Sequence, residues 1–209
     1  MRIPIIGTEG VGDVLAAAWT NSGHQIVVGD ARDRTRADAL AERIGDSVRA
    51  AAGVDEAARS AEVIVLAGGF QSLELLPSPS TTAGKVLVDA MNQVPDTEPR
   101  GTDDRPSSVI VAERFPDAAI VKAFNTIDPD ELRDSARPGI PRDRRFAIFL
   151  AGDNARANAR VATLIEEIGY TPVDTGSLRH GGALQRPGSA IFGRMLLPAE
   201  ARRVLALSR

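Results

Sequence analysis

The 209-residue chain has no cysteine, and among its 25 basic residues only Lys85 and Lys122 are lysines. The absence of cysteine excludes disulfide bonds, thiolate metal ligands and a nucleophilic thiol. A net charge of −3 does not provide the basic surface that nucleic-acid binding requires. No apolar run approaches the roughly 20 residues of a membrane helix. No signal-peptide pattern precedes the first strand, so we expect a cytoplasmic protein that binds neither nucleic acid nor membrane.

Most acid–base and metal-dependent catalytic sets are missing as well. The chain has no Ser-His-Asp set, no glutamate pair at helical spacing and no His-rich pattern, so no metal site is expected. Of its two histidines, His24 precedes a strand and is expected to be structural, whereas His180 lies in the C-terminal tail. Hydride transfer between two redox cofactors needs no such set, because the cofactors carry the chemistry.

The N-terminal segment has the pattern of a βαβ unit that binds a dinucleotide. The apolar strand Arg2–Ile6 is followed by a glycine turn, a helix over Val11–Ser22 and a second strand over His24–Val28. Such a turn directs backbone N–H groups and a helix N-terminus at a pyrophosphate. A strand–turn–helix without a ligand is the alternative. The expected contacts to NAD or NADP are Gly7, Thr8, Glu9, Gly10, Val11 and Gly12.

The turn departs from the G-x-G-x-x-G spacing at its second position. Gly7 and Gly12 occupy the first and third positions, which allow a tight turn and close helix–strand packing. Glu9 occupies the second position, where the backbone normally approaches the pyrophosphate. Its carboxylate therefore has to point away from the ligand.

Strand and helix patterns alternate along the rest of the chain, which predicts an α/β fold with a Rossmann-type, doubly wound and mainly parallel sheet. We expect residues 1–175 to form the NAD(P)-binding domain and residues 176–209 to form a small extension that completes the site or a dimer interface. A capping box at Thr35 is expected to open a helix that ends at Gly45. The other expected elements are strands at Val48–Ala51, Val63–Ala67, Val86–Asp89, Ala119–Phe124, Phe146–Ala151 and Thr171–Asp174, helices at Val109–Phe115 and from Asn154 to Gly169, and loops at Gln93–Ser108 and Arg133–Arg144.

Ligands of open parallel sheets bind beyond the carboxyl ends of the strands. This rule selects short segments that directly follow the predicted strands. Besides the glycine turn, they are Asp30, Ala31 and Arg32; Gly68, Gly69 and Phe70; Met91 to Gln93, with Asn92 as the candidate ligand; and Asn125, Thr126 and Ile127.

The residues after the second strand bear on the choice between NAD and NADP. Asp30 suits a ribose 2′-hydroxyl, whereas Arg32, Arg34 and Arg36 suit a 2′-phosphate. Cations at a helix N-terminus oppose the helix dipole unless an anion joins them, so NADP is favoured. The alternative is that these are solvated charges in which Asp30 and Asp33 pair locally.

The tail contains polar side chains between glycines that would let the backbone fold over a ligand. Packing of the tail on a partner subunit explains the same residues equally well. The candidates are Arg179, His180, Gln185, Arg186, Ser189 and Arg194.

Several segments, in order, resemble the family of NADPH-dependent reductases of coenzyme F420 (NADP oxidoreductase, coenzyme F420-dependent). They include Ile5–Thr8 with Gly12, Gly23–Gly29, Ala83–Asn92, Leu150–Asp153 and Gly169–Asp174; the most specific is Val121–Ile127, which reads Val-Lys-Ala-Phe-Asn-Thr-Ile. The resemblance implies a Rossmann domain, a homodimer, and NADP held along Thr8, Ala31–Arg32 and Asn92. It also implies that the Asn-Thr loop and the tail face the deazaflavin.

Three departures from the family pattern lie on the nucleotide side: Glu9, Ala31 and the run Gly68–Phe70. The leading hypothesis is hydride transfer between NADPH and F420, with Phe70 and Asn92 flanking the nicotinamide and Asn125, Thr126 and Ile127 beneath the second ring. One alternative is NADPH-dependent reduction of another small organic substrate, with His180 or Lys122 supplying a proton. Another is dinucleotide binding without turnover.

Overall fold

The computed structural model describes residues 1–92 and 105–208. Residues 93–104, which include Gln93 and most of the expected Gln93–Ser108 loop, lie outside the described residues. No helix in the described ranges is both long and apolar enough to cross a membrane.

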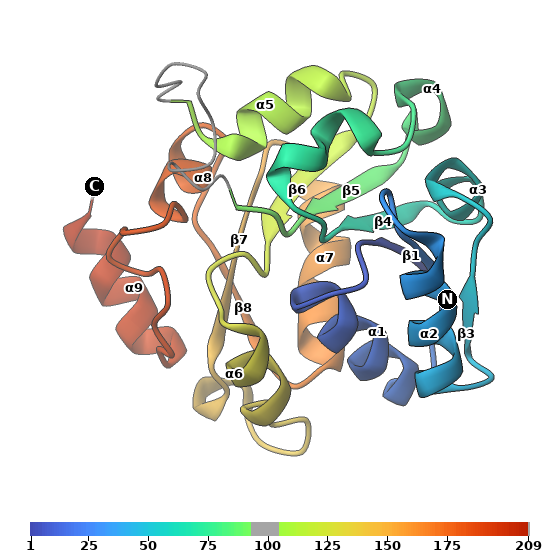
Figure 1. The fold of residues 1–209 in the computed structure, drawn as a ribbon. Helices are drawn as coiled ribbons and strands as arrows, with labels where there is room; N and C mark the ends of the chain where they lie inside the picture. The colour runs from blue at the N-terminus through green and yellow to red at the C-terminus, as the bar shows by residue number, and fades with distance from the viewer. Residues whose placement is uncertain (93–104, 209) are drawn as a thin grey trace.

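An eight-stranded sheet with the order β3-β2-β1-β4-β5-β6-β7-β8 forms the centre of the molecule (Figure 1). All neighbouring strands pair in parallel except β6 and β7, which are antiparallel. This is the expected doubly wound, mainly parallel α/β fold of the Rossmann type. The strands are β1 (Arg2–Ile6), β2 (Gln25–Gly29), β3 (Val48–Ala50), β4 (Val63–Leu66), β5 (Val86–Asp89), β6 (Ala119–Ala123), β7 (Ala147–Gly152) and β8 (Thr171–Asp174).

Helices cover both faces of this sheet, because successive strand residues point to opposite sides. In β4, Val63 and Val65 pack into one apolar cluster and Ile64 and Leu66 into the other, and all four are fully buried. The first cluster includes side chains of α1 (Val11–Asn21), α2 (Arg34–Ile44), α6 (Pro129–Asp134) and α7 (Ala155–Glu167); the opposite face carries α3 (Val54–Arg59), α4 (Pro79–Thr82) and α5 (Ser107–Arg114).

Trp19 joins two helices across the first cluster. Its indole N–H donates to the carbonyl of Leu164 in α7 at 3.1 Å, and its ring meets that of Phe124 edge-on at 5.7 Å. Phe124 follows β6 with a φ of 66°, in the left-handed region that non-glycine residues rarely adopt. The backbone therefore turns sharply just before the Asn125–Ile127 segment.

Residues after β8 pack back onto the sheet in a third apolar cluster. Ile191 and Leu196 contact Phe149 and Val173 of the outer two strands, and the N–H of Ala147 donates to Leu196. The extension contains α8 (His180–Leu184) and α9 (Pro198–Leu207). In Figure 1 both helices lie on the β8 side of the molecule.

The expected elements are present, and the differences are local. The helix expected to open at a capping box on Thr35 instead begins at Arg34, because the Asp33 carboxylate accepts the Thr35 N–H at 3.0 Å. The expected loop from Arg133 overlaps α6, whose N-cap is Asp128. Helices α3, α4 and α6 are too short to give a clear periodic signal.

Candidate functional site

The turn between β1 and α1 is packed too tightly to accept any side chain at its first and third glycines. A Cβ on Gly7, whose φ is 115°, would lie 2.5 Å from the backbone nitrogen of Gly68. A Cβ on Gly12 would lie 2.2 Å from the carbonyl oxygen of Gly7. No side chain caps the N-terminus of α1. The turn therefore brings a helix N-terminus to the carboxyl edge of the sheet, as a pyrophosphate site requires.

Glu9 points away from this turn toward α2. Its carboxylate accepts a hydrogen bond from the Arg36 guanidinium at 2.8 Å, and its side chain remains 74% exposed. Because Glu9 and Arg36 both line the pocket described below, the expectation that this carboxylate points away from a ligand stays a prediction. The carboxylate also engages a cation that the sequence associates with a 2′-phosphate.

Asp30, at the end of β2, organises the segment that leads to α2. Its carboxylate accepts the hydroxyl of Thr8 at 2.7 Å and the backbone N–H groups of Arg32 and Asp33 at 2.9 and 3.0 Å. Burial alone raises the pKa of Asp30, but these hydrogen bonds and the nearby Arg36 lower that pKa by more, so it falls below its ordinary value. Asp30 therefore stays ionised and fixes the backbone that carries Arg32.

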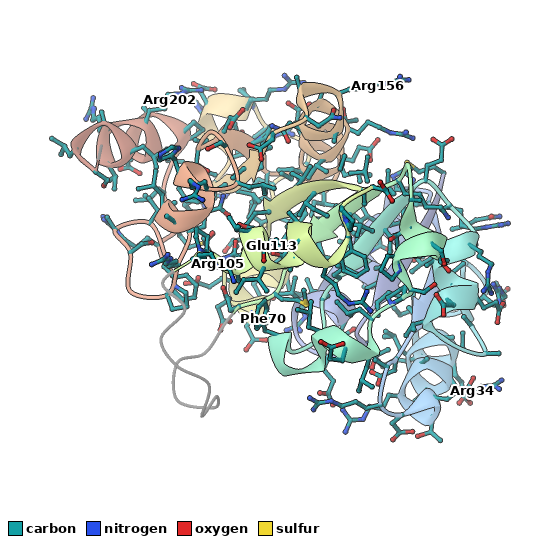
Figure 2. All side chains as sticks on the ribbon, turned by 90° about the horizontal axis from the view of Figure 1, so that it is seen from above. Arg34, Phe70, Arg105, Glu113, Arg156 and Arg202 are labelled. Atoms are coloured by element: carbon teal, nitrogen blue, oxygen red, sulfur yellow. The ribbon has the colours of Figure 1, made fainter. Side chains whose placement is uncertain are left out.

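The three arginines of this segment differ in their partners. Arg34 pairs with Asp38 at 3.7 Å and projects from the outer edge of the molecule (Figure 2). Arg36 pairs with Glu9 and, at 3.7 Å, with Asp33. Arg32 is exposed and has no ion-pair partner within residues 1–92 and 105–208. Local pairing thus accounts for Arg34 and Arg36, and it leaves Arg32 available to an anion.

These groups surround a pocket of about 100 Å³ at the carboxyl ends of β1, β2 and β4. The pocket brings together most of the nucleotide-side candidates. Phe70 is not part of its lining and begins a 3-10 helix, Phe70–Leu75, that packs against the second apolar cluster. Ile6, Ala67 and Leu76 were not singled out from the sequence, because apolar strand and loop residues carry no chemical signal. The lining residues are Ile6, Gly7, Thr8, Glu9, Asp30, Ala31, Arg32, Arg36, Ala67, Gly68, Gly69 and Leu76.

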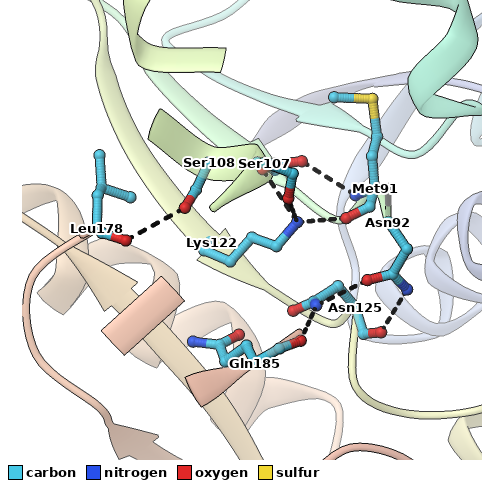
Figure 3. A network of polar contacts seen from close by, with 9 residues as sticks. Met91, Asn92, Ser107, Ser108, Lys122, Asn125, Leu178 and Gln185 are labelled. Carbon is cyan, nitrogen blue, oxygen red and sulfur yellow. Dashed lines mark hydrogen bonds and ion pairs between the residues drawn. The ribbon is translucent and has the colours of Figure 1, made fainter. Parts of the chain in front are cut away.

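Asn92 and Asn125, which follow β5 and β6, are joined by two hydrogen bonds. The Asn92 amide donates to the backbone carbonyl of Asn125 at 2.7 Å, and the Asn125 amide donates to the side-chain oxygen of Asn92 at 3.0 Å (Figure 3). The structure thus joins two candidates that lie 33 positions apart in the chain. The pair fixes both side chains at the edge of the sheet where the dinucleotide fold places its ligand.

The C-terminal extension closes over the second of these asparagines. The Asn125 amide donates to the carbonyl of Gln185 at 2.9 Å, and the N–H of Gly193 donates to the carbonyl of Thr126 at 2.8 Å. Gln185 is fully buried and Thr126 is 4% exposed, whereas Ile127 packs into the first apolar cluster. The extension therefore covers the Asn125–Thr126 segment.

The polar residues proposed as proton donors occupy different environments. His180 is exposed, and its ring contacts the hydroxyl of Ser177 at 3.2 Å. Lys122 is 2% exposed, and its ammonium contacts Asp89, the Met91 carbonyl and Ser107. Burial lowers the pKa of Lys122, and the Asp89 carboxylate opposes this shift. A charged residue within an apolar strand was the sequence signal for this buried pair.

Replacing Thr8 with valine tests the hydrogen bond to Asp30. The variant should raise the Asp30 pKa toward its ordinary value, because a donor to the ionised form is lost. A depressed pKa contributes stability that is present above the unfolded-state pKa and is lost as pH falls through the folded-state pKa. Thr8→Val should therefore lose less stability than the wild type on acidification, as followed by carboxyl NMR titration and urea unfolding.

Thr35→Val is the matched control, because the Thr35 hydroxyl donates to Asp33 at 2.7 Å and not to Asp30. It should raise the pKa of Asp33 and leave that of Asp30 unchanged. An unchanged Asp30 pKa in Thr8→Val would contradict this account of the turn.

Comparisons with known proteins identify relatives that share this fold. A hypothetical protein of Sinorhizobium meliloti has 31% identity and a TM-score of 0.81, with 94% of this chain and 95% of that chain covered. A protein of Arthrobacter sp. proposed to be an F420-dependent NADP reductase has 25% identity and a TM-score of 0.74, with 94% and 99% covered.

A curated relative, metalloreductase STEAP3 of Rattus norvegicus, is 31% identical over 208 residues. The match covers 98% of this chain but only 39% of that protein, so the chain spans about two fifths of this relative. Residues 2–93 match the family model described as NADP oxidoreductase coenzyme F420-dependent. This part of the chain belongs to that family of NADP-dependent oxidoreductases.

Proposed function

We propose that the protein transfers a hydride between NADPH and the deazaflavin coenzyme F420. The observation that carries the proposal is the interlock of Asn92 with Asn125. It places the Asn125–Thr126 segment, covered by the C-terminal extension, along the same sheet edge as the dinucleotide turn. The family resemblance further supports a homodimer.

The residues present fit an NADP molecule. The cradle formed by Gly7 and Gly12 has no room for a Cβ, and Arg32 offers an exposed guanidinium at the rim of the adenosine-side pocket. Thr8, Gly10 and Val11 would hold the pyrophosphate and Arg32 the 2′-phosphate, while Asn92 would flank the nicotinamide. When bound, NADPH supplies the hydride, and F420 takes it up together with a proton from solvent.

The protein's role in this reaction is placement. Asn125, Thr126 and the extension would form the wall against which the second ring lies, and their burial would exclude water from it. The donor and acceptor carbons must come within about 3–3.5 Å, so the rate depends on geometry more than on an acid or base.

The test is to mix NADPH, F420 and protein and follow the deazaflavin absorbance. Thr126→Leu should lower turnover much more than NADPH affinity, because the added bulk displaces the second ring but lies away from the adenosine pocket. His180→Ala is the control and should leave the chemical step intact, because His180 is exposed on the extension. No spectral change with NADPH demonstrably bound would exclude F420 as the acceptor.

A second candidate function is reduction of another acceptor by NADPH. It is favoured by the similarity to a metalloreductase over nearly the whole of this chain. Mixing NADPH and protein with free flavin or a ferric chelate in place of F420, and following the oxidation of NADPH, distinguishes the two. Turnover with either of these acceptors and none with F420 would support the second candidate.

Replacing Arg32 with alanine should weaken the binding of NADPH but not that of NADH. The loss of a charge-assisted contact to the 2′-phosphate costs roughly 1.5–3 kcal/mol, whereas NADH has no phosphate to lose. Calorimetric titration with both nucleotides measures the difference. Arg34→Ala is the control and should change neither affinity, because Arg34 pairs with Asp38 at the surface. Equal wild-type affinity for the two nucleotides would rule out a preference for NADP.

Glu9→Gly should tighten dinucleotide binding. Removing the carboxylate relieves repulsion of the pyrophosphate, about 1 kcal/mol at 4 Å even in water, and restores close backbone approach. It also frees Arg36 from its ion pair with Glu9, so the affinity for NADPH should rise more than the affinity for NADH. Glu9→Gln removes only the charge and should give part of the effect in the same titration. Weaker binding in both variants would show that Glu9 contacts the ligand favourably.

A further inference from the structure

A buried ion pair, Lys122 with Asp89, precedes the paired asparagines by three positions on each strand. Lys122 and Asp89 are register partners on neighbouring parallel strands, and their charged atoms are 3.1 Å apart. Their side chains are 2% and 0% exposed. Burying two charges is costly unless every donor and acceptor finds a partner. The further partners of this pair are the backbone of Met91 and the hydroxyl of Ser107.

Both charged groups bond to the same peptide residue. One Asp89 oxygen accepts the N–H of Met91 at 3.0 Å, and the Lys122 ammonium donates to the Met91 carbonyl. The ammonium also donates to the Ser107 hydroxyl at 3.1 Å, at the start of α5 (Figure 3). The N–H and the carbonyl of Met91 are thus bonded to the two partners of one ion pair, so the three residues form a closed loop of contacts.

The next residue along the chain is Asn92. Because Asn92 holds Asn125 through two hydrogen bonds, a shift of the Met91 peptide moves both amides. Lys122 also precedes Asn125 by three positions at the end of β6. The ammonium therefore connects the ends of β5 and β6 through space, just as the asparagines do at the surface of the site.

We propose that Lys122 is a positioning residue for the nicotinamide half of the dinucleotide, acting through Met91 on the Asn92–Asn125 pair. The inference rests on the proposed dinucleotide binding but not on F420 as the acceptor. The ammonium is buried and would act through the backbone, not by touching the ligand. It fixes the backbone that presents the two amides, and its loss should affect the nicotinamide end of the ligand while leaving the adenosine end unchanged.

A purely structural ion pair would stabilise the fold without this selectivity, so the test separates the two roles. A single substitution leaves one buried charge unpaired and can unfold the protein. The double variant Lys122→Met/Asp89→Asn removes both charges while keeping an acceptor for the Met91 N–H. Its thermal midpoint should stay near that of the wild type, but the Met91 carbonyl loses its donor.

The readout is the ratio of two dissociation constants, for NADPH and for 2′,5′-ADP, which contains only the adenosine half of NADP. The double variant should weaken NADPH binding by roughly two- to tenfold, the effect of losing one ordered hydrogen bond. It should leave the dissociation constant of 2′,5′-ADP unchanged. Ser107→Ala, which keeps the ion pair, should shift the ratio in the same direction by a smaller factor. Lys85→Met is the matched control. Lys85 is the only other lysine of the chain, and it donates to the Ala58 carbonyl at 2.7 Å, at the opposite end of β5.

An unchanged ratio in the folded double variant and in Ser107→Ala would overturn the proposal and leave Lys122 a structural residue. Equal weakening of both ligands would overturn it too, because the adenosine end would then be disturbed. Since neither ligand requires a second substrate, a wild type that binds NADPH but does not reduce F420 would refute the F420 assignment and still permit this result to be read.

Discussion

The close approach of the first turn to the sheet is the constraint on which the rest of the site depends. A Cβ at Gly12 would meet the Gly7 carbonyl at 2.2 Å, and one at Gly7 would meet the backbone beyond β4 at 2.5 Å. The absence of two side chains therefore sets how near α1 lies to β1 and β4. With that distance fixed, Gly7, Thr8 and Glu9 of the turn line the pocket that Asp30, Arg32 and Gly68 complete.

Much of the polar chemistry at this edge is engaged within the protein. Asp30 holds the backbone before α2, Glu9 holds Arg36, and the two asparagines hold each other. Apart from the side-chain oxygen of Asn125, which is buried without a hydrogen-bond partner in the described part of the chain, these groups are paired, so a ligand meets a preorganised surface with Arg32 exposed at its edge. Preorganisation reduces the entropy lost on binding, but each contact made by Glu9 or Arg36 has to be exchanged for one to the ligand.

The strands reverse direction between β6 and β7, before the chain enters the extension. Because β7 and β8 run antiparallel to the other strands, the chain leaves β8 beside β7 and returns over the Asn125–Thr126 segment. Gln185 and Gly193 reach that segment through backbone groups, so the side chain of Gln185 gave no sign of the contact, and Gly193 has no side chain. The strained Phe124 turns the same segment toward them.

The sequence alone determined the order of strands and helices, the glycine turn and the polar residues that follow the strands. These properties are local: strand burial gives apolar runs, α7 shows a helical period and an Asn154 cap, and Gly7 and Gly12 occupy the spacing that the turn demands. The short helices α3, α4 and α6 escaped prediction because fewer than two turns show no clear period.

Only the tertiary structure decided which of these groups meet. Three results depend on strand register and on the return of the extension. Arg36 pairs with Glu9, whereas Arg32 has no such partner among the described residues. Asn92 and Asn125 bond to each other, and Lys122 bonds to the Met91 carbonyl beside them. Contacts between residues far apart in sequence arise from packing of the whole chain, and no local pattern of residues encodes them.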